Sequence, residues 1–366
     1  MILSVSVIGP TGQIGSEVCL QFPIAAPIFK SKLDLRNQYL IKEVLASEKF
    51  DILINCAGIT DLGFCEENPE TASVINTHSV KEIAEFCLEH NKYLFHISDS
   101  MIFDGISSKP YDINSKPNPI NFYGRSKAEA EYQITKIMKR GTYSIIRTSS
   151  VFGPALGRSN FIEKIIASGM RCKEFVKIPS WRYITPTPAK LVAKTISAIL
   201  GEGHSNISDG LPPIVHVACS GGAITQSEVA AFVLANIPSL AHMKVTEVVK
   251  PGKGLPRVPA VTALEPSLVA PPLGLSWQNS LQEYLLQKGY ARPVCAIEVE
   301  NDVDRSVTKV WERLQRGVVP LDALVEGLRK DRANWMAGIE GPNRKASKGF
   351  WAKFGDTEEE KQKESE

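Results

Sequence analysis

Short apolar runs alternate with helical patterns along the first 150 residues of the chain. Four runs have the length and composition of buried strands: residues 4–8 (SVSVI), 51–55 (DILIN), 93–97 (YLFHI) and 143–147 (YSIIR). Between them, the apolar positions of residues 80–88 recur at helical spacing, and residues 123–139 have a helix-compatible composition. Strands that alternate with helices predict an α/β fold, in which helices cover both faces of a parallel sheet.

The regular pattern ends near Phe152. Residues 251–272 are rich in proline and predict an extended loop, and residues 278–287 could form a helix that closes the globular unit. We therefore expect a smaller and less regular lobe to follow the alternating core.

Residues 288–366 have a different pattern and predict a helical appendage. Two sets of apolar residues lie at helical spacing: Val303, Val307, Val310 and Leu314, and then Leu321, Leu324, Val325 and Leu328. After Asn334, glycine and charged residues dominate, which is typical of a solvated and partly disordered tail. Apolar stripes need burial, so the two helices are predicted to pack on the globular body or on a protein partner.

The composition of the 366-residue chain is that of an ordinary globular protein, with 43% apolar and 22% charged residues. A net charge of +2 gives no reason to expect nucleic acid or an anionic membrane as a partner. No apolar run approaches the roughly 20 residues that a membrane-spanning helix needs. The N-terminus lacks a basic segment and predicts a strand rather than a signal peptide.

Cysteine and histidine usage argues against structural cross-links. The seven cysteines are scattered and never occur as Cys-x-x-Cys, and the six histidines show no ligand spacing. We therefore expect neither a disulfide framework nor a metal site. A cytoplasmic, reducing location is the simplest interpretation.

A glycine motif, Gly9-x-x-Gly12-x-x-Gly15, follows the first predicted strand and precedes a helix. Glycines permit a tight turn and let a pyrophosphate approach the free N–H groups at a helix N-terminus. Such turns are common, and the motif alone is a weak signal. Its position in the first strand–helix unit of an alternating chain predicts a dinucleotide site.

The end of the second predicted strand, near residues 27–29, bears on which dinucleotide binds. An acidic residue here accepts a hydrogen bond from the ribose 2′-hydroxyl of NAD(H) and repels the 2′-phosphate of NADP(H). In this chain Lys30 and Lys32 follow the strand directly, and the first acidic residue after the strand is Asp34. Two ammonium groups could bind the phosphate, so we predict a preference for NADP(H), with NAD(H) possible. Alternatively, both lysines are solvated loop residues.

Tyr123 and Lys127 lie four residues apart at the start of a predicted helix and can share one face. The nearby ammonium would lower the pKa of the phenol from its ordinary value of about 10, which would make Tyr123 a usable proton donor. A Tyr-x-x-x-Lys pattern is frequent by chance. Its position about 110 residues after the glycine motif predicts a proton-transfer site next to the dinucleotide.

Several segments occur in a specific order: GPTGQIG at 9–15, NCAGIT at 55–60, HIS at 96–98, FDG at 103–105 and YGRSKAEAE at 123–131. In this order they resemble the dTDP-4-dehydrorhamnose reductase family, which belongs to the extended short-chain dehydrogenases. The resemblance continues with RTSSVFG at 147–153 and covers about residues 1–287. The predicted helical appendage lies outside it.

The resemblance implies a reductase of a nucleotide-activated 4-keto-deoxysugar that takes a hydride from a reduced nicotinamide cofactor. It implies that Tyr123 protonates the carbonyl oxygen and that Lys127 holds the nicotinamide ribose, so both residues also belong to the cofactor site. Together, the motifs and the resemblance give the rest of that site as Gly9, Gly12, Gln13, Ile14, Gly15, Lys30, Lys32, Asp34, Leu35, Gly58, Ile59, Thr60 and Ile97.

These roles divide the chain into expected domains. Residues 1–150 would form an NADP-binding Rossmann core, to which residues 186–220 return. Residues 151–185 and 221–287 would form a smaller C-terminal substrate lobe, followed by the helical appendage of residues 288–366.

The chain departs from the family pattern where the substrate is expected. The family sequence Thr-Asp-Tyr is replaced by Asp99-Ser100-Met101, so Asp99 falls where a hydroxyl should donate to the substrate oxygen. An ionised carboxylate only accepts hydrogen bonds and would repel a developing oxyanion. Ser150 replaces an aromatic residue that usually closes the sugar site. Asp99 and Ser100 therefore join the candidate catalytic residues, and Ser100 and Ser150 are candidate substrate residues.

Two functions remain open from the sequence. The preserved Tyr123 and Lys127 favour an active reductase. The changed segment at Asp99 and the C-terminal extension favour a regulatory partner subunit, similar to the regulatory subunit of methionine adenosyltransferase, which resembles the same family. Trp181 and Arg182 could touch a substrate phosphate or could simply pack at the surface.

Overall fold

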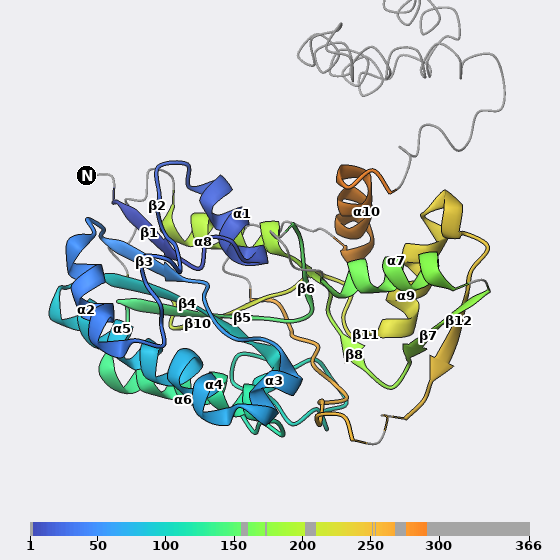
Figure 1. Cartoon of the computed structure of the whole chain (residues 1–366), viewed down its shortest axis with the longest axis horizontal. Coiled ribbons are helices and arrows are strands. Elements are labelled where there is room, and N and C mark those ends of the chain that lie inside the picture. The colour runs from blue at the N-terminus through green and yellow to red at the C-terminus, as the bar shows by residue number, and fades with distance from the viewer. Residues whose placement is uncertain are drawn as a thin grey trace, which may run out of the picture. The chain divides into compact units, whose positions relative to one another are not determined.

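Four of the six strands of the large sheet form from the runs that the apolar pattern predicts as buried strands, and two further strands complete it. In the computed structural model these four are β1 (Val5–Ile8), β3 (Ile52–Asn55), β4 (Tyr93–Asp99) and β5 (Tyr143–Thr148), and the further two are β2 (Ala26–Ile28) and β10 (Ile214–Val217). All neighbours are parallel, in the order β10-β5-β4-β3-β1-β2 (Figure 1). The predicted doubly wound α/β fold is confirmed.

The structure describes residues 3–154, 160–172, 174–201, 210–250, 252, 254–267 and 276–290. These residues lie within one compact unit, residues 1–290. The unit includes Tyr290, whose hydroxyl donates to Glu163 Oε2 at 2.9 Å, so it extends slightly past the expected end at residue 287. The appendage helices predicted between residues 303 and 328, and the charged tail, lie outside the described residues.

Helices cover both faces of the sheet (Figure 1). On one face α1 (Gln13–Gln21) packs with α8 (Ala189–Leu200). On the other face lie α2 (Gln38–Ser47), α5 (Ser79–Glu89) and α6 (Phe122–Ile137). Every residue of β1, β3 and β5 is buried, which explains why these strands are nearly continuous apolar runs.

Three short helical segments connect β3 to α5: α3 (Leu62–Glu67), α4 (Pro69–Ser73) and the π-helix η1 (Val74–His78). The side-chain amide of Asn76 in η1 is buried. Its Oδ1 accepts from Ile59 N at 2.8 Å, and its Nδ2 donates to Ile59 O at 2.9 Å and to Ser126 Oγ at 3.1 Å. This one amide therefore ties the loop after β3 to α6.

Apart from α8 and β10, the chain after β5 forms a smaller lobe from short elements. Its strands pair as β6 (Val151–Phe152) with β9 (Thr187–Pro188), β7 (Phe175–Pro179) with β12 (Lys244–Val248), and β8 (Tyr183–Ile184) with β11 (Ile224–Thr225). Its helices are α7 (Phe161–Arg171), α9 (Gln226–Ala235), the short 3-10 helix η5 (Pro238–Leu240) and α10 (Trp277–Gln287). A second 3-10 helix, η2 (Ser100–Ile102), lies outside this lobe and follows β4. The helix predicted at residues 278–287 is thus present as α10.

The proline-rich stretch, as far as it is described, is extended and runs beside β8. Tyr183 N donates to Ala260 O at 2.7 Å, and Thr262 N donates to Tyr183 O at 2.8 Å. These bonds bring Thr262 towards the carboxyl edge of the large sheet. No helix within the described ranges is long and apolar enough to cross a membrane.

Candidate active site

A cavity of about 370 Å³ opens at the carboxyl ends of β1, β3, β4 and β5. This edge of a parallel sheet is where α/β proteins hold their ligands. The cavity is lined by twelve of the predicted site residues: Gly12, Gln13, Ile14, Gly58, Ile59, Thr60, Ile97, Asp99, Ser100, Tyr123, Lys127 and Ser150. The structure thus brings together residues from five separate segments of the chain.

A second cavity of about 190 Å³ adjoins the first, since Gly12 and residues 56–59 line both. The predicted residues Gly9, Lys30, Asp34 and Leu35 belong to its wall. The two cavities form a continuous elongated site along the end of β1, as a dinucleotide requires. Among the predicted cofactor residues, Gly15 and Lys32 line neither cavity.

The glycine loop fits a diphosphate. Gly9 has φ +78°, and a Cβ there would lie 2.9 Å from Ala57 N, so a side chain would be both strained and crowded. A Cβ on Gly15 would lie 2.1 Å from Gly9 O, so Gly15 lets α1 pack against the loop rather than contacting a ligand. The N-terminus of α1 has no side-chain cap and no acidic residue in its first turn. Its free N–H groups and dipole suit an anion.

Lys30 and Lys32 have different surroundings. Lys30 lines the second cavity, whereas Lys32 forms an ion pair with Glu48. The structure therefore places only Lys30 at the cavity, and its contact with a 2′-phosphate stays a prediction. Asp34 accepts from Arg36, whose Nε lies 3.0 Å from each carboxylate oxygen, and this bond lowers the pKa of Asp34 to about 2. Sequence reasoning missed Arg36, which pairs with the Asp34 carboxylate in the wall of the second cavity.

Tyr123 and Lys127 project from the first turns of α6 into the first cavity, and each is only 5% exposed. Asn121 caps the N-terminus of α6, because its side-chain Oδ1 accepts a hydrogen bond from Gly124 N at 2.7 Å. Tyr123 Oη donates to Asp99 Oδ2 at 3.2 Å. Lys127 Nζ lies 2.6 Å from Ile97 O and 3.1 Å from His96 Nε2.

The expectation that Lys127 lowers the pKa of Tyr123 is wrong. Burial raises that pKa well above its ordinary value, and the hydrogen-bonded Asp99 carboxylate raises it further. Burial also lowers the pKa of Lys127 to about 8, although Asp99 and Glu131 oppose this effect. The same burial raises the pKa of Asp99. Burial in low-dielectric surroundings therefore disfavours the charged forms of Tyr123, Lys127 and Asp99. This effect outweighs the attraction between a Lys127 ammonium and a Tyr123 phenolate that the i, i+4 spacing suggested.

Asp99 occupies the end of β4 and begins η2. Its Oδ1 accepts from Met101 N at 2.8 Å, and its Oδ2 accepts from Tyr123 at 3.2 Å, so both oxygens are hydrogen-bonded at the cavity wall. Ser100 lies beside it and is buried. Ser150, across the cavity, has φ +45°, which is a strained backbone for a residue other than glycine.

Several cavity residues escaped the sequence analysis. Thr148 and Thr262 line the cavity, the latter from the extended stretch near β8. Trp181 and Arg182, which the sequence analysis already named as possible phosphate contacts, line neither cavity. The Nε of Arg182 and the Nε1 of Trp181 are nevertheless buried and have no hydrogen-bond partner in the part of the chain that the structure describes. Burial lowers the pKa of Arg182 to about 10, and the Asp99 carboxylate opposes that change. Buried donors without partners are rare and often mark a ligand site.

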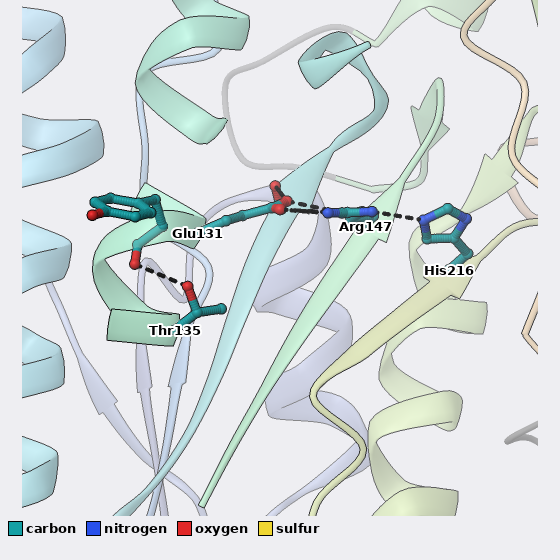
Figure 2. A network of polar contacts seen from close by, with 6 residues as sticks. Glu131, Thr135, Arg147 and His216 are labelled. Atoms are coloured by element: carbon teal, nitrogen blue, oxygen red, sulfur yellow. Dashed lines mark hydrogen bonds and ion pairs between the residues drawn. The ribbon is translucent and has the colours of Figure 1, made fainter. Parts of the chain in front are cut away.

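A buried ionic network lies one helical turn beyond Lys127. Figure 2 shows Glu131 of α6 facing Arg147 of β5, which in turn faces His216 of β10. Arg147 Nη2 lies 2.7 Å from Glu131 Oε2, and Nε lies 3.1 Å from Oε1, so the pair is bidentate. Ser98 Oγ also donates to Glu131, and Arg147 Nη1 lies 3.3 Å from His216 Nε2. The network fastens α6, and with it the Tyr123–Lys127 pair, to the sheet.

Comparison with known proteins was made on sequence and on structure. The family model for the RmlD substrate binding domain matches residues 3–268. The probable low-salt glycan biosynthesis reductase Agl14 of Haloferax volcanii is 30% identical over 199 residues, which are 54% of this chain and 63% of that protein. The dTDP-4-keto-6-deoxy-D-glucose reductase of Streptomyces niveus is 28% identical over 56% of this chain and 71% of that protein.

A solved structure shares the fold. It is the dTDP-4-dehydrorhamnose reductase of Bacillus anthracis in complex with NADP, which superposes with a TM-score of 0.67 at 23% identity. The superposition covers 78% of this chain and 100% of that one. The two chains therefore share one architecture over the compact unit.

Proposed function

The chain belongs to the RmlD substrate binding domain family, and we propose that it is an NADPH-dependent reductase of a nucleotide-activated 4-keto-deoxysugar. The observation that carries this proposal is the position of Tyr123 and Lys127 in the wall of the cavity that the glycine loop also lines. The relatives support it, since one is a reductase of a dTDP-4-keto-6-deoxy sugar and the fold neighbour holds NADP.

Residues of the two cavities would hold the dinucleotide from end to end. Gly12, Gln13 and Ile14 would present the N-terminus of α1 to its diphosphate. Lys30 would contact the 2′-phosphate, and Lys127 the hydroxyls of the nicotinamide ribose. When bound, NADPH supplies a hydride to the carbonyl carbon of the substrate.

Tyr123 would donate its phenolic proton to the carbonyl oxygen as the hydride arrives. In the ligand-free chain this proton points at Asp99 Oδ2, so the hydroxyl must turn towards the substrate. Burial raises the pKa of Asp99, which favours its neutral form. A neutral carboxyl can donate a hydrogen bond to the substrate oxygen, as the hydroxyl of the family pattern would. Asp99 would therefore assist reduction when protonated and oppose it when ionised.

Replacing Asp99 with threonine should raise kcat near pH 8 by on the order of 10-fold, because a hydroxyl donates at every pH and carries no charge. In the wild-type chain kcat should rise as the pH falls through the raised pKa of Asp99, and this dependence should vanish in the variant. The measurement is kcat against pH with NADPH and a dTDP-4-keto-6-deoxy sugar. Asp112→Thr, at an exposed carboxylate outside both cavities, is the control. A slower Asp99→Thr variant would contradict this role.

The smaller lobe would bind the nucleotide sugar, through residues 151–185 and 221–287. Arg182 and Trp181 support an anionic substrate, because their buried N–H groups lack partners among the described residues. Ser150 and Thr262 would contact the sugar from opposite segments of the cavity wall. A diphosphate or a sugar oxygen near Arg182 would satisfy a donor that is costly to leave unpaired.

Replacing Lys30 with alanine should weaken NADPH binding by about 10-fold or more, which is the usual worth of a hydrogen bond to a charged group. NADH binding should barely change, because NADH carries no 2′-phosphate. Separate fluorescence titrations with the two cofactors measure the effect. Lys32→Ala is the matched control, since Lys32 pairs with Glu48 outside both cavities. Equal losses for NADPH and NADH would remove Lys30 from phosphate recognition.

A second candidate is a cofactor-binding partner protein with little turnover. It is favoured by the Asp99–Tyr123 hydrogen bond, because a raised phenol pKa makes Tyr123 a weaker acid. Tight NADPH binding with no oxidation in the presence of nucleotide 4-keto sugars would support this candidate. A protein partner for residues 288–366 stays a prediction.

A further inference from the structure

The buried side chains of Asn55 and His96 lie directly behind Lys127. Asn55 ends β3 and is paired in register with His96 on β4. Asn55 is 1% exposed and His96 is fully buried. Asn55 Nδ2 lies 3.3 Å from His96 Nδ1, and His96 Nε2 lies 3.1 Å from Lys127 Nζ. The three groups form a line that ends at the cavity.

The orientation of the Asn55 amide is fixed from its other side. Ala57 N donates to Asn55 Oδ1 at 3.1 Å, so the oxygen must face that backbone N–H. The amide therefore presents Nδ2, which can only donate, to His96 Nδ1. A neutral imidazole has one donor and one acceptor nitrogen. Nδ1 must accept, and the ring proton must then lie on Nε2.

The proton on Nε2 has a consequence for the lysine. An ammonium has three N–H donors and no lone pair, so it would meet Nε2–H as donor against donor. An uncharged amine can accept from Nε2–H with its lone pair and still donate to Ile97 O, which lies 2.6 Å away. In this arrangement neither the Asn55–His96 contact nor the His96–Lys127 contact sets two donors against each other. The alternative tautomer would instead set Nδ1–H against the amide of Asn55.

We infer that Asn55 and His96 are positioning residues that select the uncharged form of the Lys127 amine in the ligand-free site. The charged or titratable groups that face the lysine from the surrounding elements are His96 and Asp99 of β4, Tyr123 and Glu131 of α6, and Cys56 after β3. Asp99 and Glu131 favour the ammonium, while burial favours the amine and lowers the pKa of Lys127 to about 8. The hydrogen-bond line acts in the same direction as burial.

The functional consequence rests on the proposed function. Ribose hydroxyl oxygens accept hydrogen bonds from an ammonium, and a positive charge beside Tyr123 stabilises its phenolate. At pH values near or above the Lys127 pKa of about 8, where the amine is populated, binding of the dinucleotide would then be accompanied by proton uptake at Lys127. NADPH affinity should therefore fall as the pH rises through the pKa of the lysine, because the ammonium form is lost.

The test begins with the ligand-free, full-length chain and needs no substrate. Long-range ¹H–¹⁵N NMR of the imidazole nitrogens reports which nitrogen carries the proton. His96 should carry it on Nε2 across neutral pH. His216 is an internal reference of the opposite tautomer, because its Nδ1 lies 3.1 Å from Tyr111 O, which can only accept, and its Nε2 faces Arg147. A His96 proton on Nδ1 would overturn the inference whether or not the chain is a reductase.

A variant then links the tautomer to the lysine. Asn55→Leu removes the amide donor without adding charge, so Nε2 becomes free to accept from an ammonium. The pKa of Lys127, measured from its ¹³Cε shift and assigned with Lys127→Arg, should rise by about one pH unit. The pH at which NADPH affinity falls should move up with it. An unchanged lysine pKa in a folded Asn55→Leu chain would overturn the inference. If the Asn55→Leu variant does not fold, the NMR measurement of the His96 tautomer in the wild-type chain still tests the inference.

Discussion

Replacing Tyr123 with phenylalanine should lower turnover of a nucleotide 4-keto sugar by on the order of 10²-fold or more, as the loss of a general acid does. The cavity wall should survive, because phenylalanine fills the same space and α6 keeps its Asn121 cap. NADPH affinity should barely change, since a buried ring remains beside the site. Steady-state NADPH oxidation and a separate NADPH titration measure the two quantities.

A second buried tyrosine provides the matched control. Tyr284 donates to Glu163 in the smaller lobe and lies outside the cavity at the sheet edge. Tyr284→Phe therefore removes a phenol that, like that of Tyr123, is buried and donates to a carboxylate, but it leaves the reacting groups of the cavity unchanged. Equal turnover in the wild-type chain and the Tyr123→Phe variant would remove the tyrosine from the mechanism. Loss of NADPH binding in Tyr123→Phe would show a structural rather than an acid role.

Replacing Arg147 with methionine should destabilise the fold by about 3–5 kcal/mol, the usual cost of removing one partner of a buried ion pair. Glu131 would keep its charge without the bidentate partner, since the side chains of Arg147 and Glu131 are only 3% and 6% exposed. Urea unfolding of wild type and variant, followed by circular dichroism, measures the loss. NADPH affinity should fall as well, because the network fastens α6 (Figure 2).

The double variant Arg147→Met with Glu131→Leu should recover much of this stability, because no unpaired charge stays buried. Lys190→Met is the surface control, since Lys190 and Glu283 are each 45% exposed, and such pairs contribute about 1 kcal/mol or less. A cost for Arg147→Met as small as that for Lys190→Met would show that the buried pair contributes no more to stability than a surface pair.

The sheet could be predicted because its signal is local. A strand covered on both faces carries few polar positions, so residues 51–55 and 143–147 are recognisable as mainly apolar runs. The glycine loop could be found for a related reason. Gly9 and Gly15 are required by backbone contacts within one strand–loop–helix unit.

The charge state of the site could not be predicted, because it depends on burial and on distant segments. The spacing of Tyr123 and Lys127 suggests an ammonium beside a phenol, but burial and Asp99 reverse the sign of the pKa change. From the sequence alone Lys32 resembles a phosphate ligand. In the fold it pairs instead with Glu48, the residue directly after α2. No local pattern indicates that Thr262 reaches the cavity, since only its pairing with β8 puts it there.

The amide of Asn76 makes the site cooperative in its motions. It joins the loop at Ile59 to α6 at Ser126 through three hydrogen bonds within the protein interior. We therefore expect the loop at Ile59 and the helix that carries Tyr123 to move together. Amide hydrogen exchange in the two segments should follow a single opening event. If the two segments are held in this way before a ligand arrives, binding should cost less conformational entropy than ordering two separate segments would.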